Sequence, residues 1–120
     1  MRGYISVYIS GKITGLSDYK KKFKDAEEKI NSLNYHIDRI INPANNDLIL
    51  NINHTTYEEY IKLSLCELSM CNCIFMLDNW ENSKGARLEY EYAKAHDYII
   101  LYESDYDEVL VKEKKDGSKM

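Results

Sequence analysis

The chain has 120 residues, of which 44% are hydrophobic and 30% charged, and its formal net charge is −4. These values are typical of one globular domain, and they exclude a dedicated surface for nucleic-acid polymers because the longest basic run is only Lys20–Lys22. Hydrophobic runs fall far short of the roughly 20 residues that cross a bilayer, so we expect no membrane partner.

The first strand and the first helix are predicted in the first third of the chain. Residues Tyr4–Ser10 are rich in β-branched and aromatic side chains, which is typical of a strand. Two glycines in Gly11–Ser17 end it, and Ser17 or Asp18 is expected to cap a helix that reaches about Asn34. The apolar stripe of this helix is expected to comprise Phe23, Ala26, Ile30 and Leu33.

A second strand and a second helix are predicted in the middle of the chain. His36–Ile41 is the strand, and the Asn-rich segment Ala44–His54 is expected to be a loop. Thr55 or Thr56 is expected to begin the helix, because Glu59 follows Thr56 at the capping-box spacing. One face of this helix carries Tyr57, Ile61, Leu65 and Leu68.

The last third predicts two strands around one helix. Asn72–Leu77 is a continuous apolar run, as expected of a central parallel strand buried on both faces. The polar loop Asp78–Lys84 leads to a helix at Gly85–His96, and Tyr98–Tyr102 is the final strand. The apolar face of that helix is assigned to Leu88, Tyr92 and Ala95.

The charged C-terminal end is set apart from the domain. We expect one domain over residues 1–103 and a tail over residues 104–120. Within the tail, Val109–Val111 is a candidate edge strand and Lys112–Met120 is expected to be disordered.

The alternation of strands and helices predicts the fold class. We expect a single-domain α/β fold with a doubly wound, mostly parallel sheet, Rossmann-like or flavodoxin-like, with helices on both faces. In such sheets, ligands bind outside the carboxyl ends of the strands, where the strand order reverses. The loops Gly11–Ser17 and Asp78–Lys84 are therefore the expected site.

The three cysteines, Cys66, Cys71 and Cys73, do not form a metal-binding pattern. They lack the C-x2-C pairs and the following His pair of a zinc site, so we expect buried reduced thiols and no metal. Their odd number, with no signal-peptide pattern ahead of the first strand, leads us to expect a cytoplasmic protein.

The loop after the first strand has features that suit an anion. Free N–H groups where a strand passes into a helix attract negative charge, and Gly11 and Gly15 allow close backbone approach. Lys12 adds positive charge that would attract a phosphate. The alternative is an ordinary turn with a positive φ at both glycines.

The loop before the last helix offers a second candidate. Ser83 and the N–H groups around Gly85 and Ala86 lie at a helix N-terminus, where a phosphate or oxyanion is favoured. Glu89 follows one turn later on the same face as Gly85 and Ala93, whose small side chains leave room for a ligand. The alternative is that Glu89 is an ordinary exposed helix residue.

Four segments together resemble one family. V-Y-I-S-G-K-I-T-G, N-P, T-Y-E-E-Y and W-E-N-S-K-G-A-R-L-E-Y-E-Y-A resemble a small phage and bacterial branch of the nucleoside 2-deoxyribosyltransferase-like superfamily, from about Tyr4 to Glu103. The resemblance implies that Glu89 occupies the position of the nucleophile that attacks the anomeric carbon. It also implies that Ser83 binds the sugar or the phosphate. The residues of the first loop expected to wrap the ligand are Tyr8, Ser10, Gly11 and Lys12.

The chain departs from that family at one position of the mechanism. Where the enzymes carry a helical Asp that assists proton transfer, the equivalent residue is Ser64, and Asn72 stands at the second Asp position. A hydroxyl does not replace a carboxylate as a general acid or base at neutral pH. Glu67, one turn further on, is the alternative group for this role. Lys12 stands where the family usually has Pro.

Three functions remain open at this point. The first is sequestration of a nucleotide-type ligand, such as an ADP-ribose derivative or a cyclic signalling nucleotide, as a phage counter-defence protein in the host cytoplasm. The second is an N-glycosidase or deoxyribosyltransferase acting through Glu89, and the third is a structural or protein-interaction module. Tyr8 and Trp80 would stack on a base, or simply pack in the fold, and Asp78 would contact the ligand. The resemblance implies a homo-oligomer, and we expect no cofactor.

Overall fold

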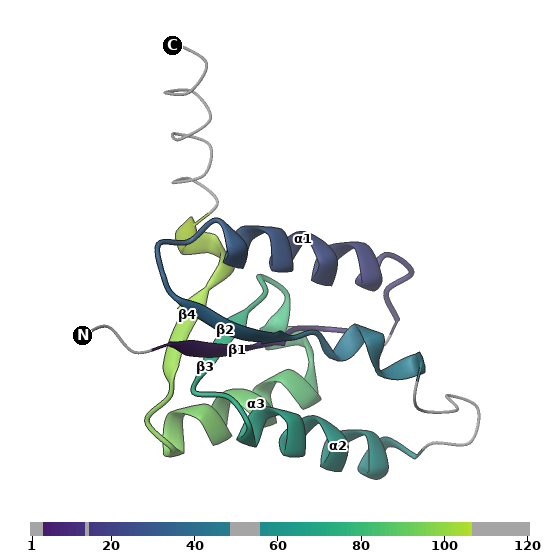
Figure 1. The fold of residues 1–120 in the computed structure, drawn as a ribbon. Helices are drawn as coiled ribbons and strands as arrows, with labels where there is room; N and C mark the ends of the chain where they lie inside the picture. Colours follow the sequence, from purple (N-terminus) through teal and green to yellow (C-terminus); the bar gives the residue numbers. More distant parts are fainter. Residues whose placement is uncertain (1–3, 14, 49–55, 107–120) are drawn as a thin grey trace.

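One parallel sheet organises the fold. The computed structural model describes residues 4–13, 15–48 and 56–106 (Figure 1). Its four strands pair in the order β2–β1–β3–β4, all parallel. They are β1 (Ile5–Ser10), β2 (Ile37–Ile41), β3 (Cys73–Met76) and β4 (Ile99–Tyr102). The four strands predicted up to residue 102 are thus confirmed, whereas the candidate edge strand and the tail expected from residue 107 onward lie outside the described residues.

The strand order creates a switch point between the two inner strands. From β1 the chain crosses to β2 on one side, and the later crossovers place β3 and β4 on the other side. β1 and β3 are in register, with Tyr8 opposite Ile74 and Ser10 opposite Met76. Their carboxyl ends therefore lie side by side where the order reverses, which is where ligands bind in sheets of this kind. The predicted doubly wound α/β fold is confirmed.

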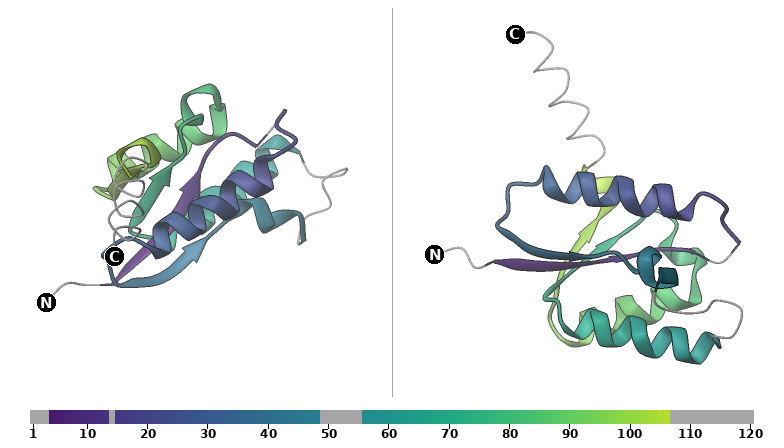
Figure 2. Two further views of the ribbon diagram at one scale, coloured as in Figure 1. Left: turned by 90° about the horizontal axis from the view of Figure 1, so that it is seen from above. Right: turned by 45° about the vertical axis from the view of Figure 1, so that its right-hand side comes forward.

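Helices cover both faces of the sheet. Helix α1 (Tyr19–Asn31) lies on one face, and helices α2 (Tyr57–Ser69) and α3 (Lys84–Ala95) lie on the other (Figures 1 and 2). Two short 3-10 helices, η1 (Pro43–Leu48) and η2 (Trp80–Asn82), precede α2 and α3. The segment expected to be a loop at 44–54 therefore begins with a helical turn, and its remainder from residue 49 lies outside the described residues.

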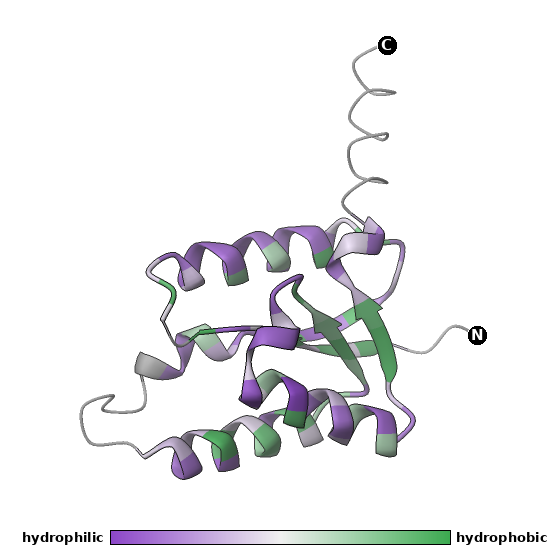
Figure 3. Ribbon diagram, turned by 180° about the vertical axis from the view of Figure 1, so that it is seen from behind, coloured by the Kyte–Doolittle hydropathy of each residue, from purple (hydrophilic) through white to green (hydrophobic). Residues whose placement is uncertain are grey.

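The core has two layers because side chains of a strand alternate between the faces. Val7 and Ile9 of β1 pack with Phe23 of α1 on one face. Tyr8, between them in sequence, packs with Leu68 of α2 on the opposite face. All residues of β3 are buried, as expected of an inner parallel strand. Figure 3 shows the result, with hydrophobic strands between helices along which hydrophilic and hydrophobic residues alternate.

The predicted apolar face of α3 is wrong for two of its three residues. Leu88 and Ala95 are exposed, and Tyr92 packs partly buried against the core. The fully buried residues of the helix are Ala86, Glu89 and Ala93. Leu88 is 43% exposed and Glu89 only 6% exposed. The small side chains of the two alanines let α3 lie close to the sheet, and polar groups of β1 satisfy the carboxylate, as the next section describes.

The predicted face of helix α2 is largely confirmed. Leu68 is buried, Leu65 packs against the core and Ile61 is half-buried, while Tyr57 is 49% exposed. Ser64, which was not assigned to this face, is also buried. Cys66 of this helix is also exposed, contrary to the expectation for all three thiols, while Cys71 and Cys73 are buried. Burial raises the pKa of Cys71 to about 11 and that of Cys73 to about 12, so these two thiols stay protonated.

The two predicted helix caps have different outcomes. Thr56 forms the full capping box with Glu59, as its sequence predicts. Asp18 is the N-cap residue of α1, but its side chain makes no capping hydrogen bond. The position predicted for the start of α1 is therefore confirmed, and the predicted bond is not formed.

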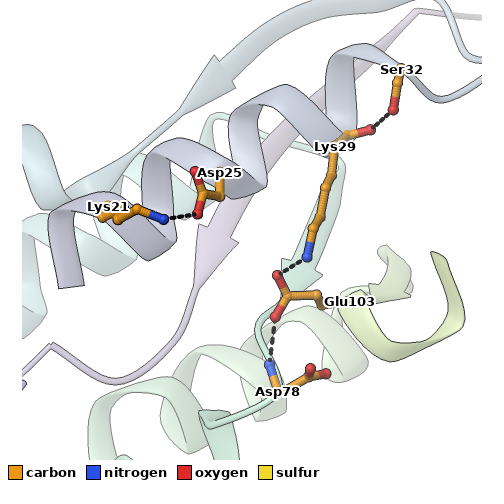
Figure 4. Close-up of polar contacts among 6 residues, drawn as sticks. All are labelled: Lys21, Asp25, Lys29, Ser32, Asp78 and Glu103. Carbon is orange, nitrogen blue, oxygen red and sulfur yellow. Dashed lines mark hydrogen bonds and ion pairs between the residues drawn. The ribbon is translucent and has the colours of Figure 1, made fainter. Parts of the chain in front are cut away.

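A carboxylate after β4 ties three elements together. Glu103 accepts a hydrogen bond from the Lys29 Nζ of α1 at 2.7 Å and another from the backbone N–H of Asp78 at 3.2 Å (Figure 4). Both side chains of the Lys29–Glu103 pair are largely buried, 25% and 14% exposed. Asp78 follows β3 and opens the loop to α3, so this contact fixes the start of that loop.

Replacing Glu103 by Gln is expected to destabilise the protein by about 1.5 kcal/mol or more, because hydrogen bonds to charged groups contribute about 1.5–3 kcal/mol. The matched control is Asp25→Asn, which breaks the exposed Lys21–Asp25 pair of α1 (Figure 4). Exposed pairs one helical turn apart contribute only about 0.3–0.5 kcal/mol. Urea unfolding measures the stability of both variants. Equal losses of stability would contradict a structural role for the contacts of Glu103 with Lys29 and Asp78.

Candidate functional site

The centre of the candidate site is a buried carboxylate held by two hydroxyl groups. The Tyr8 hydroxyl donates to Glu89 Oε2 at 2.6 Å, and the Ser10 hydroxyl donates to Glu89 Oε1 at 2.7 Å. Tyr8 and Ser10 are two residues apart on β1 and so point to the same face of the sheet, which α3 covers. Both carboxylate oxygens of Glu89 are therefore fixed from β1.

Burial makes this carboxylate hard to ionise. It raises the pKa of Glu89 from its ordinary 4.5 to about 7, against the hydrogen bonds from Tyr8 and Ser10, which lower it. The negative charge of Glu67 raises it further. The pKa of Tyr8 is raised well above its usual 10, first by burial and then by the Glu89 charge. Near neutral pH, protonated and ionised Glu89 thus coexist, while Tyr8 stays a hydrogen-bond donor.

Ser64 of α2 lies beside this pair. The residue is 1% exposed. Its hydroxyl interacts with the Tyr8 phenol through a side-chain hydrogen bond, which lowers the pKa of Tyr8. Ser64 therefore joins Tyr8, Ser10 and Glu89 in one group, which we call the carboxylate cluster.

Glu67 adds a second carboxyl group on the same side of the sheet. It follows Ser64 by one helical turn, is half-buried, and accepts a hydrogen bond from Asn46 Nδ2 at 2.7 Å. Burial raises the pKa of Glu67, and its charge reaches Glu89 as described above. Asn46 belongs to η1, so the segment after β2 also supports this side of the site.

The ends of β1 and β3 are joined next to the cluster. The Leu77 N–H donates to the Ser10 carbonyl at 2.8 Å, and the Lys12 N–H donates to Asn79 Oδ1 at 3.1 Å. A Cβ on Gly11 would lie 2.7–3.0 Å from atoms of the Leu77 side chain, so glycine is required there by close packing. Gly15 has a positive φ, at 83°, and Gly11 does not, so the alternative of a turn with a positive φ at both glycines is wrong.

The N-terminus of α3 is closed by its own residues. The Ser83 hydroxyl accepts a hydrogen bond from the Ala86 N–H at 3.1 Å, so Ser83 is a helix cap. A Cβ on Gly85 would lie 3.1 Å from Ile61 Cδ1, so this glycine allows α2 and α3 to approach each other. An anion at this end would have to bind other N–H groups or displace the Ser83 hydroxyl.

Tyr8 and Trp80, which were predicted to stack on a base, lie in different surroundings. The Tyr8 side chain is fully buried, so its hydroxyl serves Glu89 and its ring face is not accessible to a base. Trp80 is half-buried and already stacks on Tyr90, with ring centroids 4.6 Å apart. Asp78 is exposed and contributes its N–H to Glu103. None of these contacts joins Trp80 or the Asp78 side chain to the carboxylate cluster.

Sequence reasoning missed several supporting residues. Asn79, Asn46 and Glu103 each make a side-chain hydrogen bond that holds a loop of the site. Asn79 could have been found from its place just after a buried strand. The partners of Asn46 and Glu103 are 21 and 25 residues away along the chain, and no local pattern reveals them.

The described part of the chain contains neither a metal-binding cluster nor a membrane-spanning helix. Within residues 4–13, 15–48 and 56–106, no group of three or more His, Cys, Asp or Glu residues is arranged to hold a metal ion. None of the helices in the same ranges has the length and apolar character needed to cross a membrane.

Comparison with known proteins identifies one family. No curated protein and no solved structure matches the chain. A family model described as a domain of unknown function, DUF4406, matches residues 5–102, which run from the start of β1 to the end of β4 and include the whole carboxylate cluster. The chain belongs to the DUF4406 family.

Proposed function

We propose that the protein binds a nucleotide-type ligand at the carboxyl ends of β1 and β3. The observation that carries the proposal is the buried Glu89 carboxylate, fixed by Tyr8 and Ser10 beside the buried Ser64 hydroxyl. Burying an ionisable carboxyl group costs free energy that its hydrogen bonds offset only in part, so its retention favours a role other than stabilising the fold. Their position at the switch point of the sheet is where such folds bind ligands.

The class of ligand rests on the resemblance to the nucleoside 2-deoxyribosyltransferase-like superfamily. In those enzymes the residue that Glu89 matches acts on the sugar of a nucleoside or nucleotide. The proposed ligand is therefore a nucleotide, with an ADP-ribose derivative or a cyclic signalling nucleotide as the first choices. We propose sequestration of such a signal, as in phage counter-defence, as the biological use, and a homo-oligomer as the active form.

Two features favour holding the ligand over cleaving it. The position that the family uses for proton transfer carries Ser64, whose hydroxyl is a poor acid and base at neutral pH. The raised pKa of Glu89, about 7, keeps a large share of this carboxyl protonated near neutral pH, and the protonated form is a poor nucleophile.

A second candidate function is N-glycoside cleavage. It is favoured by the two hydroxyl donors that fix Glu89, since a nucleophilic carboxylate needs a defined orientation. Glu89 would form an ester with the anomeric carbon as the base leaves with a proton, and water would then release the sugar. Glu67, with its raised pKa, is the carboxyl group available to supply that proton.

One incubation distinguishes these functions. The protein is mixed with ADP-ribose, cyclic nucleotides or nucleoside monophosphates, separated from free ligand, denatured by heat and analysed by mass spectrometry. We expect intact ligand from the wild-type protein, and at least about tenfold weaker binding by Glu89→Ala, the effect of losing about 1.4 kcal/mol. Glu91→Ala, on the exposed face of the same helix, is the control and should bind normally.

The other outcomes have defined meanings. Free base released by the wild-type protein but not by Glu89→Ala supports the enzyme. A ligand present at 100 times its Kd adds about 2.7 kcal/mol of stability, so a melting temperature that no nucleotide changes would contradict both proposals. That result would favour a structural or protein-interaction module.

A further inference from the structure

The two outer strands of the sheet, β2 and β4, differ in how their free edges are protected. Strand β2 carries the exposed charged residues Asp38 and Arg39, which are typical of an edge that must not pair with another chain. Strand β4 consists of Ile99–Tyr102, which are all aliphatic or aromatic, and Ile99 is 42% exposed. Within the described residues, no further strand lies beside β4. An apolar edge without charges is a place where another strand can add.

The backbone of β4 turns hydrogen-bonding groups to its outer side. Ile99 donates its N–H to the Asn72 carbonyl, on the side of β3. Because successive residues of a strand direct their backbone groups to opposite sides, the N–H and C=O of Ile100 face away from β3. A strand that adds to this edge would therefore form its first pair of backbone hydrogen bonds with Ile100.

The sequence around Ile100 has the same character in both directions. Residues 98–102 read Y-I-I-L-Y, with an aromatic residue at each end and aliphatic residues between them. When two copies of this segment lie antiparallel with Ile100 opposite Ile100, each Tyr98 lies opposite Tyr102 and each Ile99 opposite Leu101. A two-fold axis through the central pair makes the two halves identical, as an isologous dimer requires. The strand is thus complementary to a second copy of itself.

The cross-strand partners also lie on matching faces of the sheet. Tyr98, Ile100 and Tyr102 pack against the core on the side of α2 and α3. Leu101 belongs to the core on the side of α1, and Ile99 shares that side because side chains alternate along a strand. Aromatic pairs and aliphatic pairs of this kind stabilise neighbouring strands.

Aromatic side chains next to β4 add apolar surface at this edge. The Tyr102 hydroxyl donates to the Tyr90 hydroxyl of α3 at 3.4 Å, and Tyr90 stacks on Trp80 with ring centroids 4.6 Å apart. All three side chains are half-buried, so each keeps some surface that a partner can cover. Tyr and Trp are enriched in protein–protein interfaces.

We propose that β4 is a self-association surface, through which two copies of the chain pair antiparallel over residues 98–102 and join their sheets into one. The inference rests on the homo-oligomer of the proposed function, which it locates, and it needs no bound ligand. The interface is formed by an outer strand, whereas the proposed ligand site lies at the ends of the inner strands β1 and β3.

Sedimentation equilibrium of the full chain at about 100 μM tests the pairing. We expect the wild-type protein to have twice the mass of one chain, since a Kd of about 1 μM leaves most copies paired at this concentration. Ile99→Lys and Ile99→Glu should each associate at least about tenfold more weakly, because each places two like charges at a desolvated interface. The matched control is Leu88→Lys. Leu88 is 43% exposed, but it lies on the other side of α3 from Tyr90, so this variant should keep the doubled mass.

An equal mixture of the two charged variants tests the two-fold register. In the proposed pair, residue 99 of one copy lies diagonally across from residue 99 of the other, within reach of long side chains. A lysine and a glutamate at these positions attract each other, so the mixture should recover the doubled mass that neither variant shows alone. This recovery also requires both variants to be folded. A mixture that keeps the mass of one chain would overturn the proposed pairing.

The failures of this inference and of the proposed function are distinguishable. A wild-type protein with the mass of one chain, or undiminished association of Ile99→Lys, would overturn the inference, whether or not the protein binds a nucleotide. In the first case, residues 107–120 become the candidate to cover β4. If the wild-type protein pairs, the charged variants separate it and none of the nucleotides tested above binds, the interface stands and the proposed ligand is wrong.

Discussion

The Glu89→Gln variant is expected to gain about 3 kcal/mol of stability relative to the wild-type protein as the pH rises from about 4.5 to about 7. The folded pKa of Glu89 is about 7 and its ordinary value is 4.5, so the folded protein binds this proton more tightly than the unfolded chain. Such a group stabilises the fold at low pH, and the contribution is lost as the pH rises through the folded pKa. Glutamine has the same shape and does not titrate.

The measurement is urea unfolding of both proteins at several values between pH 4.5 and 8. The size of the effect follows from about 1.4 kcal/mol for each tenfold change in proton affinity. Glu91→Gln, on the exposed face of α3, is the control and should follow the wild-type curve within about 0.5 kcal/mol. If the stability of the wild-type protein and that of Glu89→Gln change in parallel over this pH range, the burial of Glu89 does not shift its pKa and the prediction is wrong.

The second large effect is expected from Tyr8→Phe. This change removes the 2.6 Å hydrogen bond to Glu89 Oε2 and leaves the carboxylate with Ser10 as its donor in the cluster. A hydrogen bond to a charged group contributes about 1.5–3 kcal/mol, and one between neutral groups about 1 kcal/mol. The loss of stability should therefore be larger above pH 7, where Glu89 is ionised, than at pH 5.

Tyr98→Phe provides the matched comparison. The Tyr98 hydroxyl donates to the Leu68 backbone carbonyl at 2.8 Å, and this acceptor is neutral at every pH. Its removal should cost about 1 kcal/mol independently of pH. In Tyr8→Phe the pKa of Glu89 should also rise above about 7, because one group that lowers it is gone. A pH-independent loss in Tyr8→Phe would contradict the proposed charge on Glu89.

Much of the fold follows from local patterns in the sequence. The β-branched run of β1, the apolar run of β3 and the alternation with helices were sufficient for the parallel sheet and its doubly wound order. The capping box at Thr56 located the start of α2. These features depend on neighbours within a few residues, which is why the sequence alone reveals them.

The orientation of α3 depends on a distant partner and was predicted only in part. Leu88 is more hydrophobic than Glu89, so the local pattern favours burying Leu88. The structure buries Glu89 because Tyr8 and Ser10, 81 and 79 residues away, supply two hydroxyl donors. The position of Glu89 on one face with Ala93 was nevertheless readable from their four-residue spacing.

The long separation of Tyr8 and Glu89 has a consequence for the protein as it emerges from the ribosome. β1 lies between β2 and β3, so it has no complete set of strand neighbours until residue 76 has been made. At typical rates of synthesis of about 5–20 residues per second, Glu89 is made roughly 4–16 seconds after Tyr8 and Ser10. Until residue 76 has been made, β1 lacks its β3 neighbour and is an unprotected template for other extended segments. The nascent chain is therefore most exposed to aggregation before the carboxylate cluster has closed.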